Sequence, residues 1–365
     1  MPPGSVRNDA AVTHGEERKK LAHNWTLYLA AFLGAFGITL LTTPFAKWLA
    51  FRLHAIDQPK ARGMHTRPMP RLGGVAIVLG FMATVLVLFP YIQGLERRQF
   101  VGFLIGCAII VVLGIFDDIY TLRARFKLVF QIIAALVVVF SGIRIEVVLW
   151  PITTALEFFS IPFTLLWIVG VTNAVNLIDG LDGLAAGVSS IAAFSLMILC
   201  IITGSETAVV LTAALAGSCI GFLPRNFNPA EIFMGDSGST FLGFVLAVSS
   251  ILGVFKGYAI LAVVVSMLCL GLPVFDTLFA MCRRMAKGQS IMQPDRGHLH
   301  HRLIDRGYTQ KQAVLILYGI SAACGILAII LSVRRAETFV VVLLTVFLLS
   351  MVVYYFNRRN KNNKP

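Results

Sequence analysis

The chain has 365 residues, of which 57% are hydrophobic and only 13% charged, with a formal net charge of +13. Soluble domains average about 45–50% apolar and about 25% charged residues, so this composition excludes an ordinary soluble fold and predicts a polytopic membrane protein. It also excludes a secreted disulfide scaffold, a disordered chain and a nucleic-acid-binding domain.

Long apolar segments recur along the whole chain. A transmembrane helix needs about 20 mostly apolar residues, and eleven segments meet or approach this length. They predict an all-α protein with one membrane domain over 25–357, an extracytoplasmic tail over 1–24 and a short basic tail over 358–365. The predicted spans are 27–46, 73–93, 100–116, 128–149, 161–175, 184–203, 207–223, 239–255, 258–282, 312–333 and 338–356.

The first span raises the alternative of a cleaved signal peptide, because basic residues precede it. The apolar run is about 20 residues long, however, and ends at Thr42-Thr43-Pro44 rather than at a small-residue cleavage site. We therefore expect a retained helix. The six cysteines lie within or at the ends of spans without a Cys-x-x-Cys pair, so they predict neither a disulfide nor a zinc site.

The basic residues predict the orientation of the chain. Lys and Arg collect on the cytoplasmic side of membrane proteins. Of the 31 Lys and Arg residues, 21 fall on the face that holds the C-terminal tail and 10 on the other. We expect the N-terminus outside and the C-terminus inside, although Arg18, Lys19 and Lys20 beside the first span argue against it.

Two acids lie at the inner end of the third span. Near hydrocarbon, the adjacent carboxylates of Asp117 and Asp118 need a divalent cation, a proton or a basic neighbour to offset their repulsion. The alternative is an interfacial acid pair neutralised by Arg123, Arg125 and Lys127, which follow in the same loop.

The segment 173–183 follows the fifth span and contains no basic residue. Asn176, Asp179 and Asp182 offer the oxygen ligands that magnesium and calcium prefer. The intervening glycines indicate a loop whose backbone approaches a ligand. The alternative is a polar turn with a helix cap.

Two further loops lie on the same predicted face. Asp236 stands between two glycines just before the eighth span. The glycines and a helix N-terminus favour a phosphate or a metal; the alternative is that Asp or Ser caps the helix, which leaves the glycines unexplained. The stretch His298–Arg302 suits phosphate oxygens, and a zinc site is disfavoured because no cysteine lies in that loop. Its alternative is a solvated basic loop.

Acidic and basic loops on one face thus predict a metal-dependent transferase that joins a soluble phosphate donor to a membrane-held acceptor.

Together these segments resemble the polyprenyl-phosphate N-acetylhexosamine-1-phosphate transferase family. The resemblance runs from about residue 27 to 356 and includes the predicted eleven-span layout. The matching motifs are Pro70-Arg71-Leu72-Gly73-Gly74, Phe116-Asp117-Asp118, the 173–183 segment, Phe233-Met234-Gly235-Asp236-Ser237-Gly238 and His298-Leu299-His300-His301-Arg302.

The resemblance implies a reaction and its site. A UDP-N-acetylhexosamine gives its sugar-1-phosphate to undecaprenyl phosphate and leaves UMP, with magnesium, or manganese in its place, as cofactor. The resemblance also implies a homodimer among membrane lipids, in the bacterial cytoplasmic membrane, with its active site on the cytoplasmic face. The residues implied are Asp117 and Asp118 (catalytic), Asn176 and Asp236 (metal), Lys127 (lipid phosphate), and Asp57, Asp179, Asp182, Asn226, His298, His300, His301 and Arg302 (nucleotide sugar).

Leu299 interrupts the histidine run and Arg302 follows it. This resembles the branch that uses UDP-GlcNAc to start teichoic acid, O-antigen or related glycans. The alternative within the family is the branch that uses UDP-MurNAc-pentapeptide, which has three consecutive histidines.

Two rival classes fit less well. A CDP-alcohol phosphotransferase needs an arginine where Gly187 stands. A transporter favours ionisable groups near the membrane midplane, often with internal repeats, whereas the acids here cluster at one predicted surface and no repeat is seen.

Overall fold

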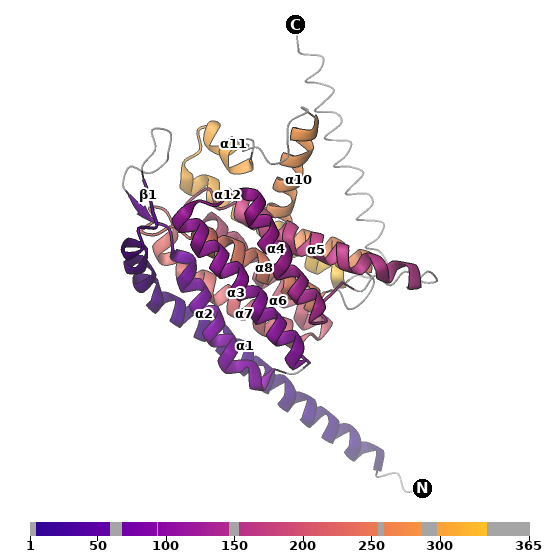
Figure 1. The fold of residues 1–365 in the computed structure, drawn as a ribbon. Helices are drawn as coiled ribbons and strands as arrows, with labels where there is room; N and C mark the ends of the chain where they lie inside the picture. Colours follow the sequence, from indigo (N-terminus) through magenta and orange to yellow (C-terminus); the bar gives the residue numbers. More distant parts are fainter. Residues whose placement is uncertain are drawn as a thin grey trace.

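The structure, a computed structural model, describes residues 5–58, 68–92, 94–145, 153–254, 259–286 and 298–333. These ranges are almost entirely helical, which confirms the all-α prediction (Figure 1). The helices are α1 (Ser5–Arg52), α2 (Gly73–Leu88), α3 (Arg97–Tyr120), α4 (Ala124–Phe140), α5 (Thr153–Leu177), α6 (Leu184–Thr203), α7 (Glu206–Asn226), α8 (Asp236–Gly253), α9 (Ala259–Cys269), α10 (Gly271–Ala286), α11 (Leu299–Asp305) and α12 (Gln310–Val333), with a 3-10 turn η1 (Phe89–Tyr91).

Eight of the described helices are long and apolar enough to cross a membrane, and α9 with α10 adds a ninth if this bent pair counts as one span. The multi-pass architecture is therefore confirmed. The count of eleven, the orientation and the domain limits stay predictions. The predicted eleventh span, 338–356, lies outside the described residues.

The predicted ninth span, 258–282, is not one straight helix. Within it, α9 and α10 meet at a bend of 97°. Pro273, in the first turn of α10, accounts for the break, because proline lacks the N–H of a helix interior and its ring clashes with the carbonyl four residues earlier. As a result α10 projects from the end of the bundle at which α11 and β1 also lie (Figure 1).

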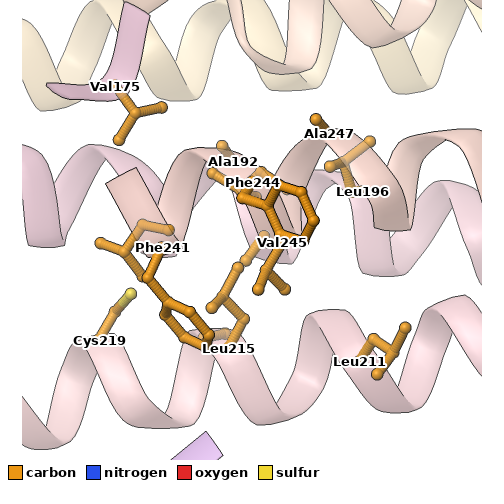
Figure 2. Packing of buried hydrophobic residues seen from close by; sticks show 14 of the residues in the cluster. Val175, Ala192, Leu196, Leu211, Leu215, Cys219, Phe241, Phe244, Val245 and Ala247 are labelled. Carbon is orange, nitrogen blue, oxygen red and sulfur yellow. The ribbon is translucent and has the colours of Figure 1, made fainter. Parts of the chain in front are cut away.

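Helix α8 lies at the centre of the bundle and packs against α2, α3, α5, α6 and α7. Its side chains Phe241 and Phe244 are fully buried, and they pack among residues of α5, α6 and α7 (Figure 2). Small residues bring backbones together, as membrane helix packing requires; a Cβ on Gly243 would lie 2.7 Å from Cα of Thr172 on α5. At the amino end of α8, Gly114 of α3 would place a Cβ 2.4 Å from Cα of Ser237, so the surrounding helices also fix that end.

A short antiparallel ribbon, β1 (Ile56–Asp57) with β2 (Met69–Pro70), precedes α2. The backbone then pairs with the segment before α8. Phe233 N–H donates to Pro70 O (2.8 Å), Gly73 N–H to Phe233 O (2.9 Å) and Gly74 N–H to Met234 O (2.7 Å). These bonds join two motifs that are far apart in the sequence, 70–74 and 233–238, and hold the segment before α8 against the start of α2.

Candidate active site

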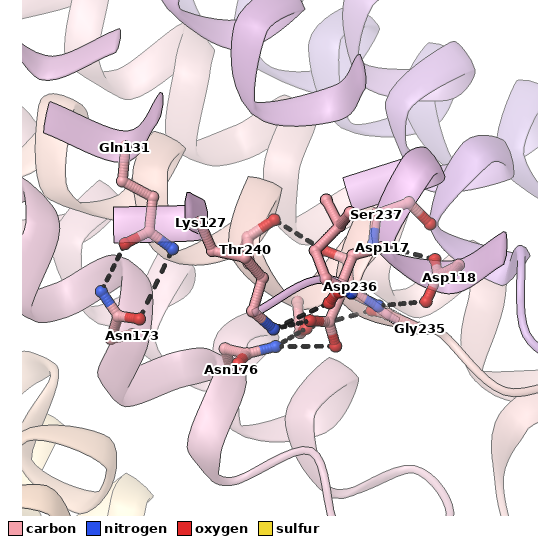
Figure 3. A network of polar contacts seen from close by, with 12 residues as sticks. Asp117, Asp118, Lys127, Gln131, Asn173, Asn176, Gly235, Asp236, Ser237 and Thr240 are labelled. Carbon is pink, nitrogen blue, oxygen red and sulfur yellow. Dashed lines mark hydrogen bonds and ion pairs between the residues drawn. The ribbon is translucent and has the colours of Figure 1, made fainter. Parts of the chain in front are cut away.

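Asp117, Lys127 and Asp236 form a charged cluster at the amino end of α8 (Figure 3). Lys127 Nζ lies 2.7 Å from Asp117 Oδ2 and 2.6 Å from Asp236 Oδ2. Asp117 comes from the last turn of α3, Lys127 from the first turn of α4 and Asp236 from the first residue of α8. The three side chains are between 7% and 24% exposed, so their charges interact more strongly than they would in bulk water.

Asn176 joins the charged cluster from the carboxyl end of α5. Its Nδ2 donates to Asp236 Oδ1 (3.1 Å) and to Ser239 Oγ (2.8 Å). The two residues expected as metal ligands, Asn176 and Asp236, are thus in direct contact although 60 residues separate them.

Asp118 has a different environment from its neighbour. Its Oδ1 accepts the N–H of Asp236 (2.8 Å), and its Oδ2 accepts the N–H of Ser237 (3.0 Å). The first amides of a helix have no acceptor within the helix, and a carboxylate there also complements the helix dipole. Asp118 therefore holds the start of α8, whereas Asp117 faces Lys127 and Asp236.

This geometry changes the expectation about the loop that contains Asp236. The amino end of α8 was expected to offer its amides to a phosphate or a metal. Asp118 accepts two of those amides, so it is the side chain of Asp236 that α8 presents to a ligand.

Asp179 and Asp182 lie in the acidic turn, residues 178–183, between α5 and α6. Burial, together with the charges of Asp236 and Asp118, raises the pKa of Asp179 to about 8, and Arg71 opposes the rise. Asp182 Oδ2 accepts Asn228 Nδ2 (2.9 Å) and Ala230 N–H (3.1 Å). Asp179 is therefore coupled to the charged cluster, whereas Asp182 ties the acidic turn to the loop before α8.

Asn226 and Asp57, also expected at the nucleotide sugar, lie outside the charged cluster. Asn226 is buried, and its amide is used within the protein: Oδ1 accepts Gly183 N–H (3.2 Å) and Nδ2 donates to Ile232 O (2.9 Å). Asp57 lies on β1, opposite Met69. Asn226 thus ties the acidic turn to the loop before α8, whereas Asp57 belongs to the ribbon that precedes α2.

The histidine motif lies at the start of α11. His300 packs on the acidic turn, since a Cβ on Gly180 would lie 2.5 Å from His300 Nε2. Burial and the neighbouring imidazoles of His301 and His298 lower the pKa of His300 to about 4. His300 is therefore a neutral imidazole at pH 7, and the structure brings the histidine motif and the acidic turn together.

The sequence analysis did not select Asp276 and Gln131. Asp276, on α10, contacts His298 and Leu299. Gln131, on α4, exchanges amide hydrogen bonds with Asn173 on α5: Asn173 Nδ2 donates to Gln131 Oε1 (2.6 Å) and Gln131 Nε2 to Asn173 Oδ1 (3.4 Å). A polar side chain within a predicted span is the signal that could have found both.

A pocket of about 270 Å³ lies between α10, α11 and α12. Its polar lining includes Asp276, Arg283 and Arg302, and Phe275, Phe279 and Ile320 contribute apolar surface. The pocket adjoins the histidine motif and not the charged cluster.

Within the described part of the chain, no group of three or more His, Cys, Asp or Glu side chains could hold a metal ion. The charged cluster nonetheless offers hard oxygen donors from Asp117, Asp236 and the amide of Asn176. Magnesium binds through one or two carboxylates and completes its shell with water and substrate phosphate. The donor set fits that mode of binding and not a cage made by protein alone.

Comparison with known proteins bears on this site. The sequence model of glycosyl transferase family 4 matches residues 100–254, which include the charged cluster and the acidic turn. The chain is 38% identical, over 88% of its length and 90% of the relative's, to a probable undecaprenyl-phosphate N-acetylglucosaminyl 1-phosphate transferase of Bacillus subtilis. It is 36% identical, over 77% of its length and 78% of the relative's, to a decaprenyl-phosphate N-acetylglucosaminephosphotransferase of Mycobacterium leprae. It is 33% identical, over 81% of its length and 87% of the relative's, to an undecaprenyl-phosphate alpha-N-acetylglucosaminyl 1-phosphate transferase of Thermotoga maritima.

Proposed function

The chain belongs to glycosyl transferase family 4, and we propose that the charged cluster is where it transfers N-acetylglucosamine 1-phosphate from a UDP-sugar to a polyprenyl phosphate. One observation carries this assignment: two carboxylates from different helices meet around Lys127 at one end of a membrane bundle. The names of the three relatives agree with the UDP-GlcNAc branch that Leu299 and Arg302 predicted.

We propose undecaprenyl phosphate as the acceptor, in the bacterial cytoplasmic membrane, with the site on the cytoplasmic face. The support is the excess of Lys and Arg on the predicted inner face and the acceptor named for two relatives. A homodimer stays a prediction.

We propose magnesium as the cofactor, held by the carboxylate of Asp236 and the carbonyl oxygen of Asn176. Both contacts of Asn176 described above use its amide nitrogen, so its oxygen is the atom that would ligate a cation. When bound, the ion would neutralise charge on the diphosphate of the donor. Manganese shares the preference for oxygen ligands.

Lys127 and Asp117 prepare the acceptor side of the reaction. Lys127 supplies a positive charge that offsets the repulsion between an incoming phosphate and the two carboxylates. Asp117 holds Lys127 through Oδ2 (2.7 Å), and its Oδ1 accepts the N–H of Leu122 (2.6 Å). Asp117 thus acts on the acceptor through the lysine, and we propose that it takes any proton that the acceptor loses.

The acceptor needs little activation. The second pKa of a phosphate monoester is near 6, so the polyprenyl phosphate is mostly a dianion at neutral pH. We propose a single displacement, in which an acceptor oxygen bonds to the β-phosphorus and the bond from that phosphorus to the bridging oxygen breaks, releasing UMP. The alternative is an aspartyl-phosphate intermediate; trapping labelled phospho-sugar on the enzyme without acceptor would establish it.

The assignment is tested by UMP release from purified protein. We expect release that requires UDP-GlcNAc, undecaprenyl phosphate and magnesium together. UDP-MurNAc-pentapeptide serves as the competing donor and is expected to react poorly. Absence of UMP with every UDP-sugar would remove the transferase assignment, and UMP release without acceptor would indicate a hydrolase.

Substitution of Gly235 tests whether the geometry of the cluster matters. Gly235 has φ +73°, and a Cβ would lie 2.0 Å from Arg71 O and 2.5 Å from Asp118 Oδ2. We expect Gly235→Ala to lower UMP release by about 100-fold or more, because a shift of about 1 Å at a reacting centre has that effect.

Gly204 supplies the matched control. It also has positive φ (+75°), but an added Cβ meets nothing within 4 Å. Gly204→Ala should therefore retain near-normal turnover. Equal losses in the two variants would attribute the effect to backbone strain alone.

A further inference from the structure

We infer that Asp276 is a positioning residue for the UDP-sugar: it fixes the ring of His298 and ties the first turn of α11 to α10. The inference rests on the proposed function, because the ligand concerned is the donor of that reaction. It concerns a residue in the projecting helix α10 and not in the charged cluster.

Two hydrogen bonds connect Asp276 to the start of α11. His298 Nδ1 lies 2.9 Å from Asp276 Oδ2, and Leu299 N–H donates to Asp276 Oδ1 (2.9 Å). The side chains of His298 and Asp276 are only 6% and 10% exposed. Burial removes water as a competing partner, so the contact with Oδ2 fixes the His298 ring and the contact with Oδ1 fixes the backbone beside it.

The chemistry of the pair assigns the hydrogen. A carboxylate has acceptor oxygens only, so the shared hydrogen belongs to Nδ1 of His298. Nδ1 carries a hydrogen in the neutral ring and in the charged ring alike. Nε2 is therefore the atom of His298 that can accept a hydrogen bond from a ligand or, once protonated, donate one to phosphate oxygen.

The second link runs from α11 to the acidic turn. The rings of His298 and His300 are stacked, with centroids 5.8 Å apart and an interplanar angle of 7°. His300 in turn packs on Gly180. Helix α11 is thus held at Asp276 on one side and at Gly180, next to Asp179, on the other.

The location of Asp276 also requires an explanation. It lies on α10 beside the apolar side chains Leu272, Phe275 and Phe279. Burying a carboxylate beside apolar side chains is costly unless it is paired and hydrogen-bonded. The contacts with α11 provide a reason for its presence.

Asp276→Asn should keep one of the two contacts of Asp276 and change the other. The asparagine oxygen can still accept Leu299 N–H, but its amide would donate to Nδ1 of His298 and force the hydrogen onto Nε2. We expect KM for UDP-GlcNAc to rise about 10-fold or more, the size of a lost charge-assisted hydrogen bond, while KM for undecaprenyl phosphate changes less than about 2-fold. Asp305→Asn, the same change at the exposed end of α11, is the matched control and should match the wild type.

A mutant cycle tests whether Asp276 acts through His298. If it does, Asp276→Asn combined with His298→Ala should have the KM of His298→Ala alone. Independent, multiplying effects would overturn the inference, as would an unchanged KM in Asp276→Asn or an equal rise for both substrates. Thermal unfolding of each detergent-solubilised variant verifies the fold. An inactive wild type would instead refute the proposed function, so the two failures are distinguishable.

Discussion

Replacing Asp236 by asparagine is expected to lower kcat by about 1,000-fold, the loss seen when a group that stabilises transition-state charge is removed. The variant removes one negative charge from the site and keeps the shape of the side chain. The fold should survive, because Asp118 contacts the backbone N–H groups at positions 236 and 237 and not the side chain. UMP release and thermal unfolding measure the two effects.

Asp236→Ala removes both oxygens and should abolish turnover. Because the proposed role is metal binding, raising magnesium should not restore the wild-type rate in Asp236→Ala. Near-normal activity of this variant with magnesium would show that Asp236 is not a metal ligand. Asp305→Asn is again the control for loss of an aspartate charge.

Replacing Lys127 by alanine is expected to raise KM for undecaprenyl phosphate about 10-fold or more, as loss of a charged hydrogen bond does, and KM for UDP-GlcNAc by less. The substitution leaves Asp117 and Asp236 without the ammonium that lies 2.7 and 2.6 Å from them. A phosphate would then meet two carboxylates whose charge is no longer offset by this lysine.

Lys47 is the matched control for this substitution. It forms an exposed ion pair with Glu231 (3.1 Å), and such surface pairs contribute about 0–1 kcal/mol. Lys47→Ala should leave both KM values unchanged. An equal rise of the two KM values in Lys127→Ala would contradict a specific role at the acceptor phosphate.

The meeting of distant motifs at one end of the bundle was predictable from the sequence. Helices that cross a membrane in alternate directions place every second loop on the same side. The contacts of Lys127 with Asp236, and of Asp182 with Asn228, confirm that these loops meet. Hydropathy and charge were sufficient to predict that these loops meet, because both depend only on residue type and spacing.

The division of roles between Asp117 and Asp118 was not predictable in the same way. Successive residues on a helix point about 100° apart, so the two side chains had to diverge. Which one faces α8 depends on how α3 is rotated against its neighbours, and the close packing of Gly114 on the backbone of Ser237 sets that rotation. Asp118 consequently holds α8, and Asp117 faces Lys127.

Asp276 was missed for a related reason. Within a predicted straight span, it has no evident partner in the sequence. The 97° bend between α9 and α10 directs α10 out of the bundle and places Asp276 against His298. Pro273 explains why the helix breaks, but the size and direction of the bend depend on how the surrounding helices pack, which the sequence alone does not give.

The central claim is that Asp236 and Asn176 hold a divalent cation at which the two anionic substrates meet. The most direct test is an anomalous difference map at the manganese edge, from crystals of the protein soaked with Mn²⁺ and UDP-GlcNAc. We predict a peak within coordination distance, about 2.0–2.3 Å, of an oxygen of Asp236 and of Asn176, and no such peak in Asp236→Asn. Bound UDP-GlcNAc with the metal elsewhere, or with an unchanged peak in the variant, would contradict the claim.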